Sequence, residues 1–138
     1  MRVVVDTDLL VRGAMSRGPR GAPLNRLGQP GFELIYSRQL LEELIEVLNR
    51  SKFRERYRVT DARRDALLAS ITRFGIRVEP NRAISVCRDP DDDKLLEAAV
   101  ASQADAIVTT DHDLLALNPF EGIRIVTPLV LVAMLDLN

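Results

Sequence analysis

The sequence has 138 residues, of which 46% are hydrophobic and 28% are charged, and its net charge is −1. This composition suits one globular domain with a single hydrophobic core. No apolar run reaches the ~20 residues that cross a bilayer, aspartates at positions 6 and 8 interrupt the first apolar stretch, and the single cysteine excludes an internal disulfide. We therefore expect a cytoplasmic protein that has no membrane partner.

From the N-terminus, the pattern predicts a strand over 2–6, a helix over 7–15, a short helix over 24–28, a strand over 32–36 and a helix over 38–49. The first strand is rich in valine, as the interior strands of parallel sheets are. The helix over 38–49 carries leucines and isoleucine at helical spacing, and Ser37 is a suitable residue to cap it.

The predicted elements of the second half are helices over 61–74, 93–103, 111–117 and 129–135, with strands over 76–79, 105–110 and 123–126. Residues 50–59 are basic and less regular, and we expect a connector there. Thr60 and Gly75 are suitable residues to begin and end the helix over 61–74. The last helix is almost wholly apolar, so we expect it to be buried.

The alternation of strands and helices predicts an α/β fold, in which helices cover both faces of a parallel sheet. In open sheets of this kind, ligands bind beyond the carboxyl ends of the strands. Residues that follow strands are therefore the first candidates for a functional site.

Acidic residues from four separate segments are predicted to lie at that edge. Asp6 is the last residue of the first predicted strand and Asp8 lies two residues later, whereas Asp111 and Asp113 follow the fourth strand. The stretch "RDPDDDK" supplies Asp89, Asp91, Asp92 and Asp93 at the start of the helix that leads into the fourth strand. Glu42, Glu43 and Glu46 lie early in the helix after the second strand.

Each acidic segment has a simple explanation by itself, because acids cap helices and favour helix N-termini by ~0.3–1 kcal/mol. Together they would repel one another, and Arg88 and Lys94 are the only local bases. Carboxylates gathered in this way bind Mg²⁺ or Mn²⁺. One histidine and one cysteine do not provide a zinc site.

Positive charge is concentrated in the first part of the chain. Residues 1–84 contain 16 of the 19 lysines and arginines, against 10 acids, whereas residues 85–138 contain 3 basic residues and 10 acids. The densest run, residues 50–64, has seven basic residues and two acids, with Phe53 and Tyr57 between them. Such a run is either a solvated surface or a contact for a polyanion, and the sequence leaves both open.

Four stretches, "VVVDTDLLV", "SRQLLEELIEVLNRSKF", "CRDPDDDKLLEAAVASQADAIVTTDHDLLAL" and "IRIVTP", resemble the PIN domain. The branch that they resemble is that of the small prokaryotic PIN proteins of VapC-like toxin–antitoxin pairs. The resemblance runs from residue 2 to about residue 130 and implies one PIN domain over 1–138. It also implies a parallel five-stranded sheet of order 3-2-1-4-5 and the activity of a metal-dependent endoribonuclease.

The resemblance further implies which residues act. The implied catalytic residues are Asp6, Glu43, Asp93 and Asp111. The implied ligands of one or two Mg²⁺ or Mn²⁺ ions are Asp6, Asp93, Asp111 and Asp113, with Asp89, Asp92 and Glu42 as weaker alternatives. Candidate contacts to RNA are Arg12, Arg17, Arg20, Lys52, Arg54 and Arg56. The family also implies a small antitoxin protein and a homodimer as partners.

Two alternatives remain at this point. The motif "VVVDTDLL" also resembles the first motif of haloacid-dehalogenase-like phosphatases, in which Asp6 would be a nucleophile. Those enzymes need a lysine before a late acidic motif, whereas Lys94 follows the acids. The second alternative is a catalytically silent PIN module that binds RNA or protein.

Overall fold

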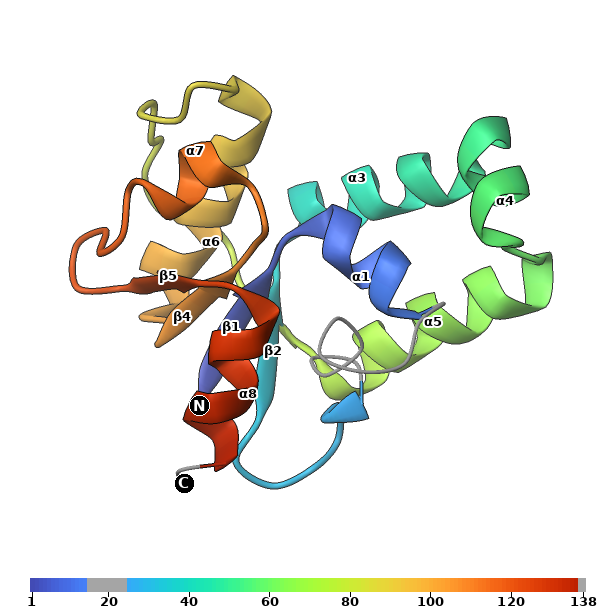
Figure 1. Cartoon of the computed structure of the whole chain (residues 1–138), viewed down its shortest axis with the longest axis horizontal. Coiled ribbons are helices and arrows are strands. Elements are labelled where there is room, and N and C mark those ends of the chain that lie inside the picture. Colours follow the sequence, from blue (N-terminus) through green and yellow to red (C-terminus); the bar gives the residue numbers. More distant parts are fainter. Residues whose placement is uncertain (15–24, 137–138) are drawn as a thin grey trace.

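Five parallel strands form one sheet in the order β3-β2-β1-β4-β5, which confirms the predicted fold class (Figure 1). The computed structural model describes residues 1–14 and 25–136. The strands are β1 (Arg2–Val5), β2 (Glu33–Tyr36), β3 (Ile76–Arg77), β4 (Ala106–Val108) and β5 (Arg124–Val126).

The valines of β1 explain why helices cover both faces of the sheet. Val3 and Val5 belong to one hydrophobic cluster and Val4 to another, since successive side chains of a strand point to opposite faces. All three are at most 3% exposed. A strand with two buried faces needs apolar residues at every position, and β1 has them.

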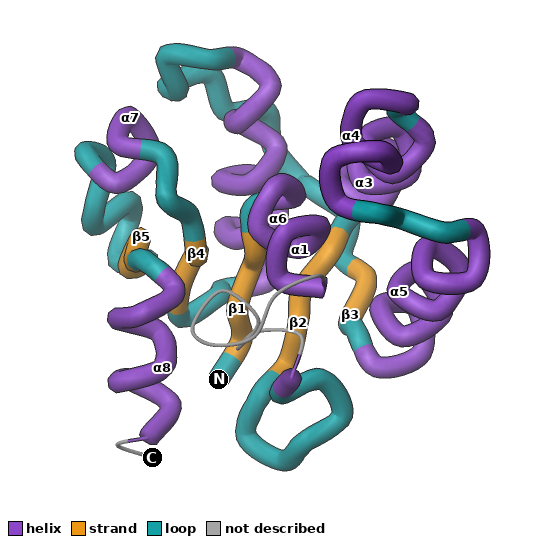
Figure 2. The backbone as a smooth tube through the Cα atoms, turned by 45° about the vertical axis from the view of Figure 1, so that its right-hand side comes forward, coloured by secondary structure: helices purple, strands orange, loops and turns teal. Residues whose placement is uncertain are grey.

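The helices are α1 (Thr7–Ala14), α3 (Arg38–Asn49), α4 (Ser51–Tyr57), α5 (Asp61–Phe74), α6 (Asp93–Ser102), α7 (His112–Leu115) and α8 (Pro128–Asp136). Residues of α1, α5 and α8 pack with most of α3 on the face of Val3 and Val5, whereas α6 and α7 cover the face of Val4. Figure 2 shows the strands side by side, with α1 over β1 and β2. None of the described helices is long and apolar enough to cross a membrane.

The two long helices begin where their capping residues predict. The Ser37 hydroxyl accepts a hydrogen bond of 3.2 Å from the backbone N–H of Leu40. The Thr60 hydroxyl accepts one of 3.1 Å from the backbone N–H of Arg63. These bonds satisfy N–H groups that have no partner inside the helix, which fixes the first turn.

Several predicted elements differ from the structure. The described residues 26–28 of the short helix predicted over 24–28 form a turn. Residues 51–57, expected to be a less regular segment with at most a helical turn, form the two-turn helix α4, which follows α3 after an extended residue at Arg50 and ends at Arg58 in the left-handed region. This helix buries no residue completely, so its sequence shows little apolar periodicity.

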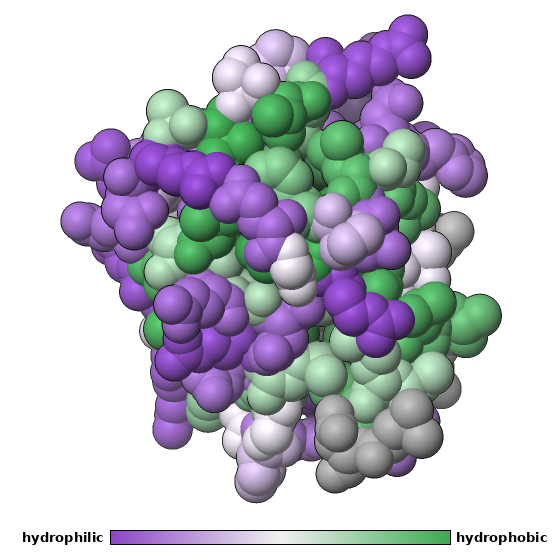
Figure 3. All heavy atoms as spheres, turned by 90° about the vertical axis from the view of Figure 1, so that its left-hand side faces the viewer, coloured by the Kyte–Doolittle hydropathy of each residue, from purple (hydrophilic) through white to green (hydrophobic). Residues whose placement is uncertain are grey.

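The last helix was expected to be buried, and this prediction is wrong. In α8 only Pro128 and Leu131 are buried, whereas Leu129 is 67% exposed and Val130 39% exposed. Leu131 packs into the same cluster as Val3 and Val5, and among the described residues none covers the outer side of α8 at Leu129. Apolar residues also reach the surface elsewhere, as on the face in Figure 3, where green hydrophobic residues lie between purple hydrophilic ones.

Candidate active site at the carboxyl edge of the sheet

Asp6 lies immediately after β1 and is held in place by β4. Its backbone N–H donates to the Val108 carbonyl at 2.9 Å, which extends the parallel pairing by one residue. Its carboxylate Oδ2 accepts a hydrogen bond of 2.9 Å from the Thr109 hydroxyl. Burial raises the pKa of Asp6, the Thr109 hydrogen bond partly offsets this, and the negative charges of Asp8 and Glu43 raise it further. Burial and the neighbouring negative charges therefore both disfavour the ionised form of Asp6.

Glu43 points from α3 toward the same edge. Its Oε2 accepts a 3.0 Å hydrogen bond from the hydroxyl of Thr7, the residue next to Asp6. Its Oε1 lies 3.6 Å from Nζ of Lys94, at the start of α6. The alternative acid of this helix, Glu42, is exposed and forms an ion pair of 3.7 Å with Arg38. The structure therefore favours Glu43 over Glu42.

Asp93, the acid expected to open α6 as a ligand, turns its carboxylate into a loop. Its Oδ1 accepts hydrogen bonds from the backbone N–H groups of Val86 at 3.1 Å and Cys87 at 2.8 Å, and the residue is 8% exposed. Burial favours the protonated form, but these hydrogen bonds outweigh it and lower the pKa of Asp93. A carboxylate used in this way fixes the loop over 86–87.

Asp92 is the acid of this segment that the other carboxylates influence. Its pKa is raised to about 7, first by burial and then by the negative charges of Asp6, Asp89, Asp111 and Glu43. Carboxylates that follow β1 and β4, together with one from α3, thus act on the Asp92 side chain. The structure places Asp92, expected only as a weaker alternative to Asp93, among the site acids.

The remaining predicted acids act at least partly as caps. Asp111 Oδ1 accepts from the backbone N–H of Asp113 at 2.9 Å and caps α7, and its own N–H donates to the Thr109 hydroxyl at 3.0 Å. Asp89 Oδ1 accepts from the N–H of Asp91 at 3.0 Å. Asp113 is exposed, and its carboxylate lies 3.9 Å from the Arg88 guanidinium. Of these, Asp111 alone combines partial burial with contact to Thr109 and influence on Asp92.

A divalent cation suits the chemistry of these donors. The acids that converge are all carboxylates, which are hard oxygen ligands, and their mutual repulsion is what a cation would relieve. Among the described residues, however, no three acidic, histidine or cysteine side chains already stand at the spacing that holds a metal ion. The donor types fit, and binding would require the carboxylates to approach one another.

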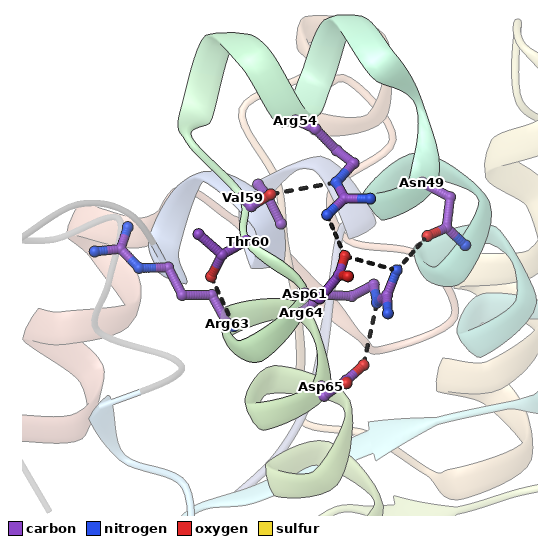
Figure 4. A network of polar contacts seen from close by, with 8 residues as sticks. All are labelled: Asn49, Arg54, Val59, Thr60, Asp61, Arg63, Arg64 and Asp65. Carbon is purple, nitrogen blue, oxygen red and sulfur yellow. Dashed lines mark hydrogen bonds and ion pairs between the residues drawn. The ribbon is translucent and has the colours of Figure 1, made fainter.

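The basic residues expected to contact RNA fall into two groups. Lys52 and Arg56, together with Arg12 of α1, line a hollow of about 580 Å³. Arg54 points elsewhere: it donates to the Val59 carbonyl at 3.2 Å and pairs with Asp61, which also pairs with Arg64 (Figure 4). Arg54 thus joins α4 to α5. Arg17 and Arg20 lie outside the described residues.

Sequence reasoning missed two threonines that position the acids. Thr109 is fully buried, and its hydroxyl joins Asp6 to the backbone of Asp111, whereas Thr110 is exposed. Thr7 is 4% exposed and holds Glu43. The available signal was their place next to strand-end acids, in "DTD" and "TTD", where a buried hydroxyl must find a polar partner.

Comparison with known proteins settles the family. The sequence model of the PIN domain family matches residues 2–113, which are most of the chain. The chain belongs to the PIN domain family. This membership gives no support to the phosphatase alternative.

Two similar proteins show how far the likeness extends. The uncharacterized protein MJ1680 of Methanocaldococcus jannaschii is 28% identical over 120 residues, which cover 85% of this chain and 75% of that protein. A chain in the crystal structure of VapBC2 from Rickettsia felis, bound to a DNA fragment from their promoter, matches with a TM-score of 0.60 and 14% identity. The match covers 92% of this PIN domain chain and 98% of that chain. At that identity the match shows the fold alone.

Proposed function

We propose that this PIN domain protein is a divalent-metal-dependent endoribonuclease. The observation that carries the proposal is the convergence of carboxylates from four segments, Asp6, Glu43, Asp92 and Asp111, on one edge of the parallel sheet. Burial, followed by the negative charges of Asp6, Asp89, Asp111 and Glu43, raises the pKa of Asp92 to about 7. A cap role explains Asp111, but Glu43 lies inside α3 and the Asp92 side chain makes no cap hydrogen bond, so capping does not explain why these acids lie where they repel one another.

Asp6, Asp92 and Asp111 are the residues that would hold one or two Mg²⁺ or Mn²⁺ ions, with Glu43 beside them. When bound, such an ion supplies charge stabilisation to a phosphodiester and makes water a better nucleophile. Relief of carboxylate repulsion would contribute to the binding free energy. Asp93 is left out because its Oδ1 accepts two backbone N–H groups, and Asp89 and Asp113 are left out because they are exposed. Asp111 also caps a helix, but it is half-buried and its charge acts on Asp92.

The residues of the chain itself position the acids. The Thr109 hydroxyl holds one oxygen of Asp6, and the backbone of Asp8 also hydrogen-bonds to this carboxylate. Thr7 and Lys94 occupy both oxygens of Glu43 and so orient it from α3. The positive side chains of Arg12, Lys52 and Arg56 offset the repulsion between an acidic site and the RNA phosphates.

Cleavage of RNA by paired variants of neighbouring acids tests the proposal. Unstructured RNA is incubated with Mn²⁺ or Mg²⁺ and one of three proteins: the wild type, Asp92→Asn, or the control Asp91→Asn. Asp91 is exposed and lies in the same helical turn as Asp92. A second pair is Glu43→Gln with Glu42→Gln. We expect metal-dependent cleavage that Asp92→Asn and Glu43→Gln reduce at least about 100-fold, while each control retains it.

The outcomes separate the remaining readings. Equal loss in Asp91→Asn and Asp92→Asn, or activity without added metal, would contradict the assigned site. Metal binding with no cleavage of any RNA would make the chain a silent module. Hydrolysis of small phosphate esters in place of RNA would revive the phosphatase alternative.

We propose further that a small antitoxin protein restrains this activity. Support comes from the shared fold with a chain of the VapBC2 complex. Expression of the chain alone in a bacterial host should arrest growth, and Asp6→Asn should relieve the arrest. Unchanged growth with active enzyme present would argue against a toxin. A homodimer, the other proposed partner, is tested by light scattering of the purified chain.

A further inference from the structure

A hollow beside the acidic edge combines positive charge with aromatic rings. It measures about 580 Å³, within the range of ligand pockets, and is lined from α1 and α4. The lining residues that matter here are Arg12, Arg50, Lys52, Phe53, Arg56 and Tyr57.

The charge of this hollow is only partly balanced. Arg12 forms an ion pair with Asp8 at 3.1 Å, and Arg50 forms one with Glu46 at 2.8 Å. Among the described residues, no carboxylate lies within ion-pair distance of Lys52 or Arg56, and both side chains are exposed. Two cations are therefore available to an anionic ligand.

The aromatic rings belong to the same wall. The centroids of Phe53 and Tyr57 lie 5.2 Å apart with the ring planes tilted by 35°, and the Arg56 guanidinium lies 5.5 Å from the Tyr57 ring. Both rings are partly buried against the hydrophobic core, so packing explains why part of each ring is apolar. Both rings nevertheless line the hollow, where a planar ligand could stack.

The hollow lies next to the acidic edge. Arg50 also lines a second hollow of about 570 Å³, which includes Glu43 and Lys94. On the other side, Asp8 lines the basic hollow and is two residues from Asp6. Of the four proposed site acids, Glu43 lines the second hollow, so the basic hollow lies near the proposed site.

We propose that this hollow binds unpaired nucleotides of the substrate, with a base stacked on Phe53 or Tyr57 and phosphates beside Lys52 and Arg56. The inference rests on the proposed ribonuclease function and adds that the RNA is single-stranded where it leaves the site. Bases inside a duplex are stacked on each other and offer no free face, so a stacking wall selects unpaired RNA. An acidic peptide would use the cations but would not need two rings.

The test measures binding of fluorescently labelled oligouridine by anisotropy in EDTA, where no metal-dependent cleavage occurs. Phe53→Leu keeps apolar packing and removes the stacking face, and Tyr57→Leu is a second variant if the first is poorly folded. Arg56→Gln removes one cation. The matched controls are Phe74→Leu and Arg73→Gln: Arg73 lies 5.2 Å from the Phe74 ring on α5, and neither residue lines the hollow.

We expect Phe53→Leu to weaken binding of oligouridine about fivefold or more and to leave binding of inorganic polyphosphate unchanged. Arg56→Gln should weaken both ligands and reduce the salt dependence of binding. The controls should behave as wild type. Equal effects of Phe53→Leu and Phe74→Leu, equal affinity for duplex RNA, or competition by polyglutamate as effective as by RNA would overturn the inference.

The two proposals fail separately. If RNA binds in the hollow but is never cleaved with Mn²⁺, the ribonuclease function is wrong and the binding site stands. If Phe53→Leu cleaves subsaturating RNA as fast as wild type, the ribonuclease stands and the binding site is wrong.

Discussion

The Thr109 hydroxyl is the smallest group on which the geometry of the site depends. It donates to Asp6 and accepts from the N–H of Asp111, so one buried oxygen joins the ends of β1 and β4. Thr109→Val keeps the shape and removes both hydrogen bonds, which we expect to cost about 1–3 kcal/mol of unfolding free energy. Because the lost bond lowers the pKa of Asp6, that pKa should rise further. Urea unfolding and an NMR titration of the carboxyl group measure the two effects.

The adjacent residue provides the control for this prediction. Thr110 is exposed, so Thr110→Val should change neither the unfolding free energy nor the titration of Asp6. If both threonine variants behave alike, the bridge between the two strands is not what holds Asp6.

Asp92 and Asp93 should give opposite pH signatures although they are neighbours. Between pH 3.8, the ordinary value, and about pH 7, folded Asp92 keeps a proton that the unfolded chain releases. Its contribution to stability is therefore complete at low pH and is lost as the pH rises through that window. Asp93, whose pKa is lowered, contributes stability at neutral pH that is lost as the pH falls.

Urea unfolding in EDTA across this pH range measures both signs. Asp92→Asn should stabilise the metal-free protein at neutral pH and have little effect below pH 3.8, where the wild-type group is protonated in both states. Asp93→Asn should destabilise most at neutral pH. The reverse pattern would mean that the two carboxylates have been assigned to the wrong roles.

At the scale of elements, α8 shows how burial divides an apolar helix. Leu131 is fully buried and Leu129 is 67% exposed, although both are leucines of one short helix. Leu131→Ala should lower the free energy of unfolding by about 2–5 kcal/mol, because it leaves a cavity in the core. Leu129→Ala should change it by less than about 0.5 kcal/mol. Equal losses in urea unfolding would show that the outer face of α8 is covered in solution.

The same helix shows what a sequence pattern can and cannot specify. Capping residues and apolar spacing are local, so the bounds of the helices over 38–49 and 61–74 were predicted correctly. A helix that is apolar all round carries no directional information, and its environment depends on elements far away in the chain. The full helix α4 was not predicted, because it buries no residue completely and its sequence has little apolar periodicity.

The acids show a similar limit at closer range. Alternation of elements places Asp6, Glu43 and Asp111 at one edge of the sheet, and the structure brings them there. Successive residues at a helix start differ by about 100° in direction, so the sequence does not say which of three consecutive aspartates faces the site. That choice depends on the loop over 86–87, whose N–H groups take Asp93 and leave Asp92 to the cluster.

At the scale of the whole molecule, the site acids couple metal binding to folding. Unfolding separates Asp6, Asp92 and Asp111, which lie in distant parts of the sequence, so the proposed cation binds the native state in preference to the unfolded chain. Mn²⁺ at about 100 times its dissociation constant should therefore raise the free energy of unfolding by about 2.7 kcal/mol. Thermal unfolding with and without Mn²⁺ measures this, and Asp92→Asn should lose most of the increase while Asp91→Asn keeps it. An equal increase in both variants would place the ion away from the four acids, because a cation held by surface charge alone would not distinguish two neighbouring aspartates.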